Sequence, residues 1–397
     1  MSLPSVEAAR AAMLAWAQAL PAETVALAEA VGRTLAEDIH ALRNQPPYPA
    51  SAMDGWAAAA ADIPGRLRIA GESAAGTPYA AALARGEVVR IFTGAALPVG
   101  SDTVVIQEVA TRDGDHVELP QTPRGQYVRP AGCDFYGGER LLTRGTKLDA
   151  WRLSLAAAGG RGEVAVARRP RVSFLSTGEE IIDPGQMPGP YQIFDAGTVA
   201  LVALAGRWGA AATRLKPVGD DIAATAGAVR AAECDVIVTV GGASVGDHDL
   251  VKPALAQLGL ELAVESVNVR PGKPTWFGRL ADGRRVLGLP GNPSSALVCA
   301  ELFLHPLLRA MQGGDPTVCL IPARAAAPFP ANGSREHWMR AKITSGADGG
   351  LNAEAFADQD SSLVSVFASA DALVRRRAGA TALEPGGLVE ALLLERA

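Results

Sequence analysis

The chain has 397 residues, of which 48% are hydrophobic and 20% are charged, a balance typical of folded proteins and not of disordered ones. This length exceeds what one hydrophobic core usually supports, so we expect roughly two to four domains. The formal net charge of −5 and the scatter of Lys and Arg along the chain argue against a nucleic-acid-binding surface. No stretch approaches about 20 uncharged apolar residues, and the first residues lack a signal-peptide pattern, so we expect a cytoplasmic protein outside the membrane.

The first 140 residues predict a helical part followed by a β-rich part. Apolar residues at helical spacing over 5–20 predict an amphipathic helix that Pro21 ends. The proline-rich run 44–49 cannot be helical and marks a boundary. Residues 46–140 alternate short strand-like runs with Gly and Pro, and Asp113-Gly114 indicates a hairpin. We therefore expect an inserted β-rich domain over 46–140.

The helical part resumes after this insertion. A helical pattern over 148–158 ends at a Gly-Gly pair, so we assign 1–45 and 141–168 to one N-terminal helical and extended domain. Strand-like and helical segments then alternate, with a hairpin at Asp282-Gly283. This alternation predicts an α/β domain over 169–315, a mostly parallel sheet with helices on both faces. Residues 316–397 return to short strand-like runs and should form a separate β domain.

Cysteine spacing gives no sign of a metal site or a disulfide framework. Cys133, Cys234, Cys299 and Cys319 are far apart and form no C-x-x-C pair. We expect buried free thiols.

A glycine-rich turn follows one apolar strand of the α/β domain. The string T-V-G-G-A-S-V-G-D-H-D spans 239–249, and its glycines, Gly241, Gly242 and Gly246, allow an anion to approach backbone N–H groups. The string lacks the Lys of a P-loop and the G-x-G-x-x-G spacing. A purely structural tight turn is therefore the alternative to binding a phosphate or a pterin.

Two further turns should reach the same edge of the sheet. The string V-R-P-G-K-P (269–274) places Arg270 and Lys273 on a proline-stiffened loop. Such a loop would make an anion clamp, with a solvated surface pair as the alternative. The string G-L-P-G-N-P-S-S (288–295) ends a buried strand, and its Ser294 can cap the next helix.

Acidic residues also follow the strands of this domain. Glu180 lies in S-T-G-E-E after the first strand, Asp220 and Asp221 follow the second, and Asp247 and Asp249 follow the third. Carboxylates beside an anion clamp would repel an anionic substrate unless a hard cation such as Mg²⁺ bridges them. Taken one at a time, each is better explained as a solvated loop residue.

The β-rich domain contributes two more strings, S-A-M-D-G-W (51–56) and F-T-G-A-A-L-P (92–98). Asp54 lies in a segment that is too apolar for a plain surface loop, and Thr93 follows a strand. Turn chemistry alone could account for both.

These six strings, taken in their order along the chain, resemble the molybdopterin molybdenumtransferase family, which includes the C-terminal domain of gephyrin. The resemblance covers the whole chain and implies a dimerising helical part, a β-rich lid, a molybdopterin-binding α/β domain and a C-terminal β-barrel. It implies a homodimer in which each active site lies between the α/β domain of one protomer and the lid of its partner. The implied reaction converts adenylylated molybdopterin and molybdate to molybdenum cofactor and AMP, with Mg²⁺ as cofactor.

The resemblance also implies roles for individual residues. The catalytic group would comprise Asp54, Thr93, Glu180, Asp220 and Asp249. Three of these carboxylates, Glu180, Asp220 and Asp249, would place Mg²⁺.

Substrate contacts follow from the same resemblance. The molybdate pocket would contain Arg270, Lys273 and Pro274, completed by Arg340 and Ser361 from the barrel. The remaining contacts would come from the turns: Gly241, Gly242, Ser244, Gly246, Pro290 and Asn292.

The chain departs from the family pattern at several positions. Pro49-Ala50 stand where an acidic-polar pair is usual, Arg270 replaces a Lys, Cys133 replaces an acidic residue, and Ala196-Gly197 replace a polar pair. Because a planar guanidinium and a compact ammonium bind oxyanions differently, we expect a different clamp geometry.

Two other functions are compatible with the same fold. The adenylyltransferase that makes adenylylated molybdopterin from ATP has a similar α/β domain and G-G-x-S string, but it usually lacks the lid and the barrel. That enzyme is also a candidate partner. A gephyrin-like scaffold would bind a partner peptide without turnover. The presence of Asp54, Lys273 and Arg340 favours catalysis.

Overall fold

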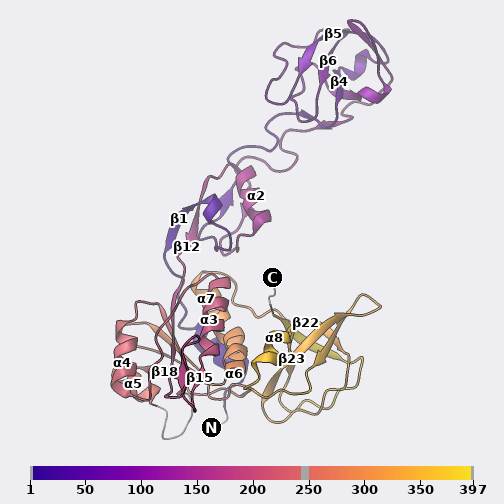
Figure 1. Cartoon of the computed structure of the whole chain (residues 1–397). Helices are drawn as coiled ribbons and strands as arrows, with labels where there is room; N and C mark the ends of the chain where they lie inside the picture. The colour runs from indigo at the N-terminus through magenta and orange to yellow at the C-terminus, as the bar shows by residue number, and fades with distance from the viewer. Residues whose placement is uncertain (1–2, 243–249, 395–397) are drawn as a thin grey trace.

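The computed structural model describes residues 3–242 and 250–394. It shows an elongated molecule in which an α/β domain lies beside a β-barrel, and a narrow arm leads from them to a separate sheet at the far end (Figure 1). We call these four parts the α/β domain, the barrel, the arm and the distal sheet. In the described part of the chain, no helix combines the length and the apolarity needed to cross a bilayer.

The chain begins with α1 (Val6–Leu14), whose first turn is capped by the Ser5 hydroxyl. The predicted helix ran to residue 20, but Trp16 and Ala17 form tighter bonds to carbonyls three residues back, which ends the α-helix. The apolar side of α1 packs into the core of the α/β domain. The first helix therefore packs away from the arm that follows it.

The arm is built from two short antiparallel pairs and one helix. β1 (Ala22–Ala26) pairs with β12 (Glu163–Ala167), and β2 (Ile39–His40) pairs with β11 (Arg140–Leu142). Helix α2 (Ala150–Ala158) covers them, with Asp149 as its N-cap. A small hydrophobic cluster of its own stabilises the arm.

The distal sheet has six strands in the order β7-β4-β6-β5-β9-β8. Asp113-Gly114 turns between β8 and β9, with Gly114 at φ +60°, so the predicted hairpin is confirmed. A short pair of β3 (Ala50–Ser51) and β10 (Val128–Arg129) joins the sheet to the arm. Its strands are β4 (Gly55–Ala58), β5 (Gly65–Ser73), β6 (Glu87–Ile91), β7 (Thr103–Ile106), β8 (Thr111–Asp113) and β9 (His116–Leu119).

The α/β domain has a six-stranded sheet in the order β16-β13-β17-β21-β20-β18. The first four strands pair in parallel, β20 pairs antiparallel with both β21 and β18, and β20 and β21 form the predicted hairpin. The strands are β13 (Arg171–Ser176), β16 (Ala211–Arg214), β17 (Val236–Val240), β18 (Glu261–Val264), β20 (Trp276–Arg279) and β21 (Arg285–Leu289). The mostly parallel sheet expected from the sequence is confirmed.

Helices cover both faces of this sheet. On one face, α1, α3 (Ala196–Arg207), α6 (Pro293–Cys299) and α7 (His305–Met311) share the largest hydrophobic cluster. On the other face, α4 (Ile222–Ala231) and α5 (Val251–Ala256) pack against a second cluster. A π-helical stretch over residues 300–304 joins α6 to α7, so the two helices form one continuous helical stretch. The loop between β13 and α3 carries a short pair of β14 (Ile181–Ile182) and β15 (Ile193–Phe194).

The barrel consists of five strands that close on themselves, because β23 pairs with β24 on one side and with β25 on the other. The strands are β22 (Ile321–Ala325), β23 (Glu336–Ser345), β24 (Leu351–Ala355), β25 (Ala372–Arg376) and β26 (Leu388–Leu393), with α8 (Val364–Ser369) between β24 and β25. A sixth strand, β19 (Val269–Arg270), joins from the α/β domain by pairing with β23. The β-barrel implied by the family resemblance is confirmed.

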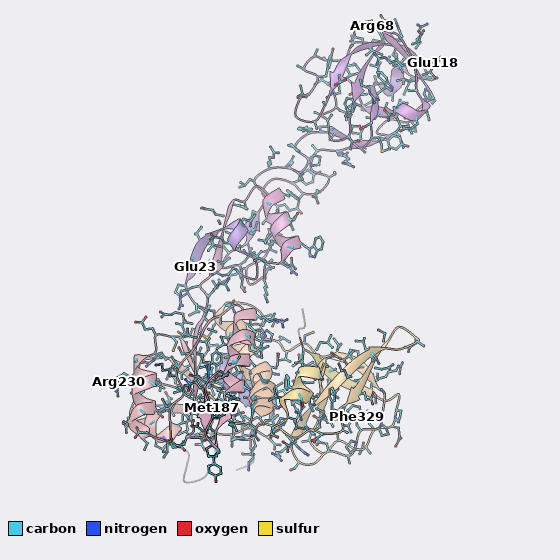
Figure 2. All side chains as sticks on the ribbon, viewed as in Figure 1. Glu23, Arg68, Glu118, Met187, Arg230 and Phe329 are labelled. Atoms are coloured by element: carbon cyan, nitrogen blue, oxygen red, sulfur yellow. The ribbon has the colours of Figure 1, made fainter. Side chains whose placement is uncertain are left out.

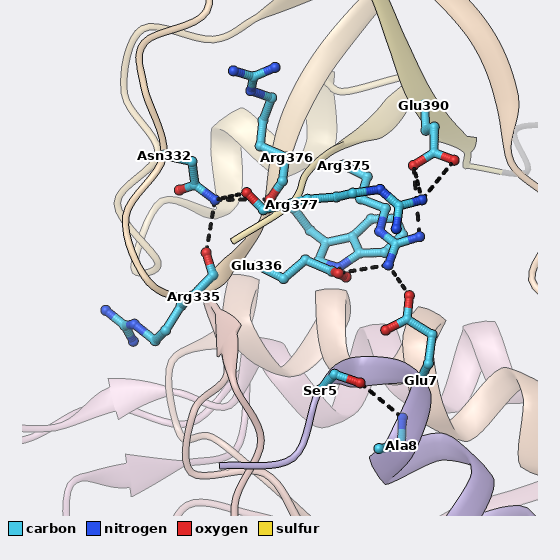
Figure 3. Close-up of polar contacts among 11 residues, drawn as sticks. Ser5, Glu7, Ala8, Asn332, Arg335, Glu336, Arg375, Arg376, Arg377 and Glu390 are labelled. Atoms are coloured by element: carbon cyan, nitrogen blue, oxygen red, sulfur yellow. Dashed lines mark hydrogen bonds and ion pairs between the residues drawn. The ribbon is translucent and has the colours of Figure 1, made fainter. Parts of the chain in front are cut away.

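An ion-pair network ties α1 to the barrel (Figure 3). The Arg375 guanidinium contacts Glu7 from α1 and lies 2.7 Å from Glu336 and 3.7 Å from Glu390. The Trp338 indole N–H donates to Glu336 at 2.8 Å. The N-terminal helix is therefore held between the α/β domain and the barrel.

The expectation of buried free thiols is confirmed for two cysteines and wrong for the other two. Cys234 and Cys299 are buried, whereas Cys133 and Cys319 are exposed. Cys133 lies in a turn, where its N–H bonds the Pro130 carbonyl, and Cys319 lies in the connection before β22. Connections of this kind run over protein surfaces, which explains their exposure.

Candidate active site

The loops that carry the sequence motifs meet at one edge of the α/β sheet. In the strand register, Ser176 of β13 is opposite Val240 of β17, which is opposite Leu289 of β21. Trp276, the first residue of β20, pairs with Gly288. The loops after β13, β17 and β21 and the loop before β20 therefore start from one row of residues, at the strand ends where α/β proteins bind ligands.

The two glycine-rich turns at this edge are in contact. Gly241 has φ +95°, and a Cβ there would lie 2.6 Å from the Thr177 carbonyl oxygen. A Cβ on Gly291 would lie 3.4 Å from the Gly241 Cα. Gly242 also has a positive φ, of +56°. Glycine is thus required for close packing as well as for any approach of an anion.

The glycine-rich turn after β17 contains three predicted site residues that lie outside the described residues: Ser244, Gly246 and Asp249. Asp247 lies outside them as well.

The two acidic loops lie side by side. The Gly178 N–H donates to the Val218 carbonyl at 3.1 Å, which joins the loop after β13 to the loop after β16. A Cβ at Gly178 would lie 2.5 Å from a Glu180 carboxylate oxygen, and a Cβ at Gly219 would overlap the Glu179 carboxylate. Glu180 and Asp220 are both exposed. Exposed carboxylates on adjacent loops are available to a cation or a substrate.

These loops fit a magnesium ion only if substrate supplies further oxygens. Among the described residues, no three His, Cys, Asp or Glu side chains are grouped as a metal site. Mg²⁺ often uses one or two carboxylates, several waters and substrate phosphates. Glu180 and Asp220 suit that mode of binding and not a cage made of protein ligands alone.

The predicted anion clamp lies where the α/β domain joins the barrel. Lys273 is exposed and Pro274 is partly exposed, and both precede β20. Gly272, at φ +115°, packs against the buried Cys299 thiol so closely that a Cβ would overlap Cys299 Sγ. Arg270 belongs to β19 and is exposed. The loop is therefore fixed on α6 while its cations face outward.

The register of β19 also brings Arg270 next to a buried histidine of the barrel. Arg270 pairs with His337 on β23. Burial and then the charges of Arg270, Arg340 and Arg335 lower the pKa of His337 to about 4, so its imidazole is neutral near pH 7. The charges of Arg270 and Arg340 both act on His337, so both guanidinium groups lie near this histidine. Sequence reasoning missed His337.

Arg340 is buried and donates to a neighbouring loop. Only 1% of its surface is exposed, and burial lowers its pKa. Its guanidinium donates to the Asp360 carbonyl at 3.0 Å, the Leu363 carbonyl at 3.2 Å and the Gln359 side chain at 3.3 Å. Arg340 therefore holds the loop that contains Ser361.

Ser361 and Asn292 are brought together across the domain boundary. The Asn292 amide donates to the Ser361 hydroxyl at 2.8 Å. Asn292 follows Pro290, which is buried at the end of β21. The structure thus joins the barrel loop to the turn that contacts Gly241.

The sequence analysis did not identify Asp195, a buried carboxylate, as part of this edge of the α/β sheet. It caps α3 by accepting from the Thr198 N–H at 3.0 Å, and it also accepts from Ser176 and Arg214. Burial alone would raise the pKa of Asp195, but the bonds from Ser176 and Thr198 outweigh it and lower that pKa. The D-x-x-T spacing is a capping signal that could have revealed this role.

In the distal sheet, Asp54 and Thr93 form a pair. Asp54 Oδ1 accepts from the Thr93 N–H and from the Thr93 hydroxyl, both at 2.8 Å. These bonds lower the pKa of Asp54, so the carboxylate is ionised at neutral pH. The distal sheet is separated from the α/β domain by the whole arm (Figure 1). Within one chain, Asp54 and Thr93 therefore do not meet the motif loops.

Large apolar side chains are exposed near the acidic loops. Met187, which Figure 2 labels on the α/β domain, is 91% exposed, and Tyr191 is 89% exposed. Ile193, Phe194 and Val199 are exposed as well. The Ile193 N–H bonds the Glu180 carbonyl at 2.7 Å. An exposed apolar surface beside polar loops is typical of an interaction site.

Comparison with protein families places three consecutive matches along the chain. The MoeA N-terminal region (domain I and II) matches residues 4–160, a probable molybdopterin binding domain matches 173–310, and the MoeA C-terminal region (domain IV) matches 322–394. These matches and the fold define a multidomain protein of the MoeA type, with the glycine-rich edge in its probable molybdopterin binding domain.

Individual relatives support the same family. A molybdopterin molybdenumtransferase of Nostoc sp. is 36% identical over 303 residues, covering 73% of this chain and 70% of its own length. Molybdopterin molybdenumtransferase 1 of Mycobacterium tuberculosis is 31% identical over 98% of this chain and 99% of its own length. The crystal structure of the molybdopterin biosynthesis moea protein from Pyrococcus horikosii is 29% identical, covers 100% of both chains and superposes with a TM-score of 0.84. The chain belongs to the molybdopterin molybdenumtransferase family.

Proposed function

We propose that this protein inserts molybdate into adenylylated molybdopterin and releases AMP, forming molybdenum cofactor. Membership of the family supports the reaction class. The observation that carries the proposal is the meeting of the two glycine-rich turns, the acidic loops and the clamp loop at one sheet edge. Such an edge offers backbone N–H groups and cations to an anionic substrate.

Each group at this edge has a distinct task in the proposal. Gly241, Gly242 and the undescribed Ser244 and Gly246 would hold the pterin or its phosphates through backbone N–H groups, with Pro290 and Asn292 shaping the adjoining wall. Arg270, Lys273 and Pro274 would bind molybdate together with Arg340 and Ser361. Positive charge close to developing negative charge is the usual way to stabilise transfer at phosphorus. Asp54, kept ionised by Thr93, would orient or deprotonate the attacking oxygen.

Magnesium belongs to the proposal as a cofactor. Glu180 and Asp220, with the undescribed Asp249, would hold the ion beside the phosphoanhydride. When bound, Mg²⁺ would neutralise charge on the phosphate oxygens. The protein side chains would then position the substrate and exclude water.

We also propose a cytoplasmic homodimer. The whole arm separates Asp54 and Thr93 from the motif loops of their own chain. A complete site therefore needs the distal sheet of a second copy. The exposed apolar residues around Tyr191 border the acidic loops and would be covered by that sheet. The molybdopterin adenylyltransferase is the proposed supplier of substrate.

Mixed dimers test this arrangement. Chains carrying Asp54→Ala and chains carrying Lys273→Ala are co-expressed with different tags, and the doubly tagged dimer is purified. If sites are shared, one site of the mixed dimer has both changes and the other has neither, so activity at low molybdate exceeds that of either parent dimer. Activity no higher than the parents' would place Asp54 and Lys273 in the same site of one chain.

The reaction itself is tested by AMP release from molybdopterin adenylate with Mg²⁺, with and without molybdate. Molybdate-dependent release supports the proposal and directs attention to Arg270 and Lys273. Transfer of AMP from Mg-ATP to molybdopterin without a second protein would instead identify an adenylyltransferase. Binding of a partner peptide with no turnover would identify a scaffold.

A further inference from the structure

One half-buried amide, Gln359, makes four hydrogen bonds in the barrel. Its side-chain oxygen accepts from the Arg340 backbone N–H at 2.9 Å and from Arg340 Nε at 3.3 Å. Its side-chain nitrogen donates to the Arg340 carbonyl at 3.0 Å and to the Phe356 carbonyl at 2.8 Å. An amide has an acceptor at one end and donors at the other, and both ends are used here.

The loop held by Arg340 and Gln359 is attached at its other side to α6. The Ser294 N–H donates to the Ser361 carbonyl at 3.2 Å, and the Ser294 hydroxyl donates to the Leu363 carbonyl at 2.9 Å. The N-cap residue Asn292 makes no capping bond with its own side chain and donates instead to Ser361. The loop therefore supplies the cap that α6 lacks.

These bonds form one continuous connection from strand β23 to the turn beside Gly241. Gln359 fixes Arg340, Arg340 fixes the carbonyls of Asp360 and Leu363, and Ser361 then meets Asn292. Arg340 is almost fully buried, so its guanidinium cannot reorient freely once the amide is in place.

From this connection we infer that Gln359 is a positioning residue for the molybdate pocket, fixing the Arg340 guanidinium and the hydroxyl of Ser361 for the oxyanion. This role rests on the proposed function. In this role Gln359 does not contact substrate. It acts through Arg340 and the loop that contains Ser361.

The experiment compares Gln359→Met with a matched control, Gln312→Met. Gln312 is also buried, and its amide donates to the carbonyls of Trp208 at 2.9 Å and Leu308 at 3.0 Å, within the α/β domain. Both changes remove amide hydrogen bonds without a large change in shape. We expect Gln359→Met to raise the KM for molybdate about tenfold, since a misplaced charge-assisted bond typically costs that much. The KM for molybdopterin adenylate should change little.

A third variant separates charge from shape. Gln359→Glu keeps an acceptor for Arg340 but loses both donations and pairs the guanidinium with a carboxylate. We expect its KM for molybdate to rise at least as far as in Gln359→Met, because the carboxylate competes with the oxyanion. A KM equal to that of the unchanged protein would overturn the inference.

A readout without turnover keeps the two proposals distinguishable. Hydrogen–deuterium exchange over 356–363 is measured with no substrate present, and molybdate binding is titrated calorimetrically. Faster exchange and weaker binding in Gln359→Met, but not in Gln312→Met, support the positioning role. Faster exchange with unchanged molybdate binding would make Gln359 merely structural and refute the role. If the unchanged protein releases no AMP with molybdate, the proposed function fails, whereas unaltered exchange in Gln359→Met refutes the connection itself.

Discussion

Replacement of Gly272 by alanine tests how the clamp loop is held. At φ +115°, an L side chain is strained, which costs about 1–3 kcal/mol. The new Cβ would also fall under 3.0 Å from Cys299 Sγ, in a core position with no exposed surface. Overpacking of this kind costs a further 1–3 kcal/mol or so. Together the two costs are about 2–6 kcal/mol. For a domain of this size, roughly 2–4 °C of Tm is lost per kcal/mol, so Gly272→Ala should lower the Tm by about 4–24 °C.

A double-mutant cycle separates the two costs. Cys299→Ala removes the sulfur and its 3.1 Å bond from Thr275, and in that background Gly272→Ala should lose only the backbone strain. The coupling between the two changes should be on the order of 1–3 kcal/mol. The KM for molybdate should rise in Gly272→Ala, since Lys273 is adjacent, and fall back in the double variant. Additive losses of Tm would refute the claim that Cys299 forces a glycine at this position.

Three further predictions concern single side chains. Asp54→Ala should abolish AMP release with an unchanged Tm, because Asp54 is partly exposed and, among the described residues, its carboxylate accepts hydrogen bonds only from Thr93; full activity would remove Asp54 from the site. Lys273→Ala should mainly weaken molybdate binding, since Lys273 is exposed on the clamp loop; an unchanged molybdate titration would count against the clamp. His337 has the ordinary histidine pKa of 6.5 in the unfolded chain and a pKa of about 4 in the folded protein. As the pH falls from 6.5 to about 4, the unfolded state takes up the proton first, so stability is lost over this range. The loss is at most about 3 kcal/mol, and His337→Gln should flatten the dependence of Tm on pH; a slope like that of the unchanged protein would contradict it.

The sequence was informative where structure is set by neighbouring residues. The hairpins at Asp113-Gly114 and Asp282-Gly283 follow from local turn chemistry, and both are confirmed. The alternation of strands and helices identified the parallel sheet and therefore the edge at which its loops meet. Strand ends are harder to predict from sequence: β16 (Ala211–Arg214) stops before Pro217, which has no N–H for a ladder.

Contacts between distant segments could not be read from the sequence. Closure of the barrel needs β23 to pair with β25, and nothing in either strand alone specifies that partner. The ion pair between the buried Asp195 and the half-buried Arg214 joins the residue after β15 to the last residue of β16. Gln359 looks like an ordinary polar loop residue until Arg340 is placed beside it. Such residues become recognisable only when the fold supplies their partners.

The short strand β19 has a consequence for how this protein can be divided. Val269 and Arg270 lie between two strands of the α/β sheet, yet they pair with β23 of the barrel. A fragment that stopped before the barrel would leave the backbone of these two residues without its partner, and the backbone at the clamp would lose its alignment. The chain therefore cannot be divided at the domain boundary predicted near residue 316 without breaking this pairing. A fragment ending there would retain the glycine-rich turns, but its clamp loop would be held by the packing of Gly272 on Cys299 and no longer by β23. Shuffling of these parts between relatives should therefore succeed only when β19 and β23 come from the same parent.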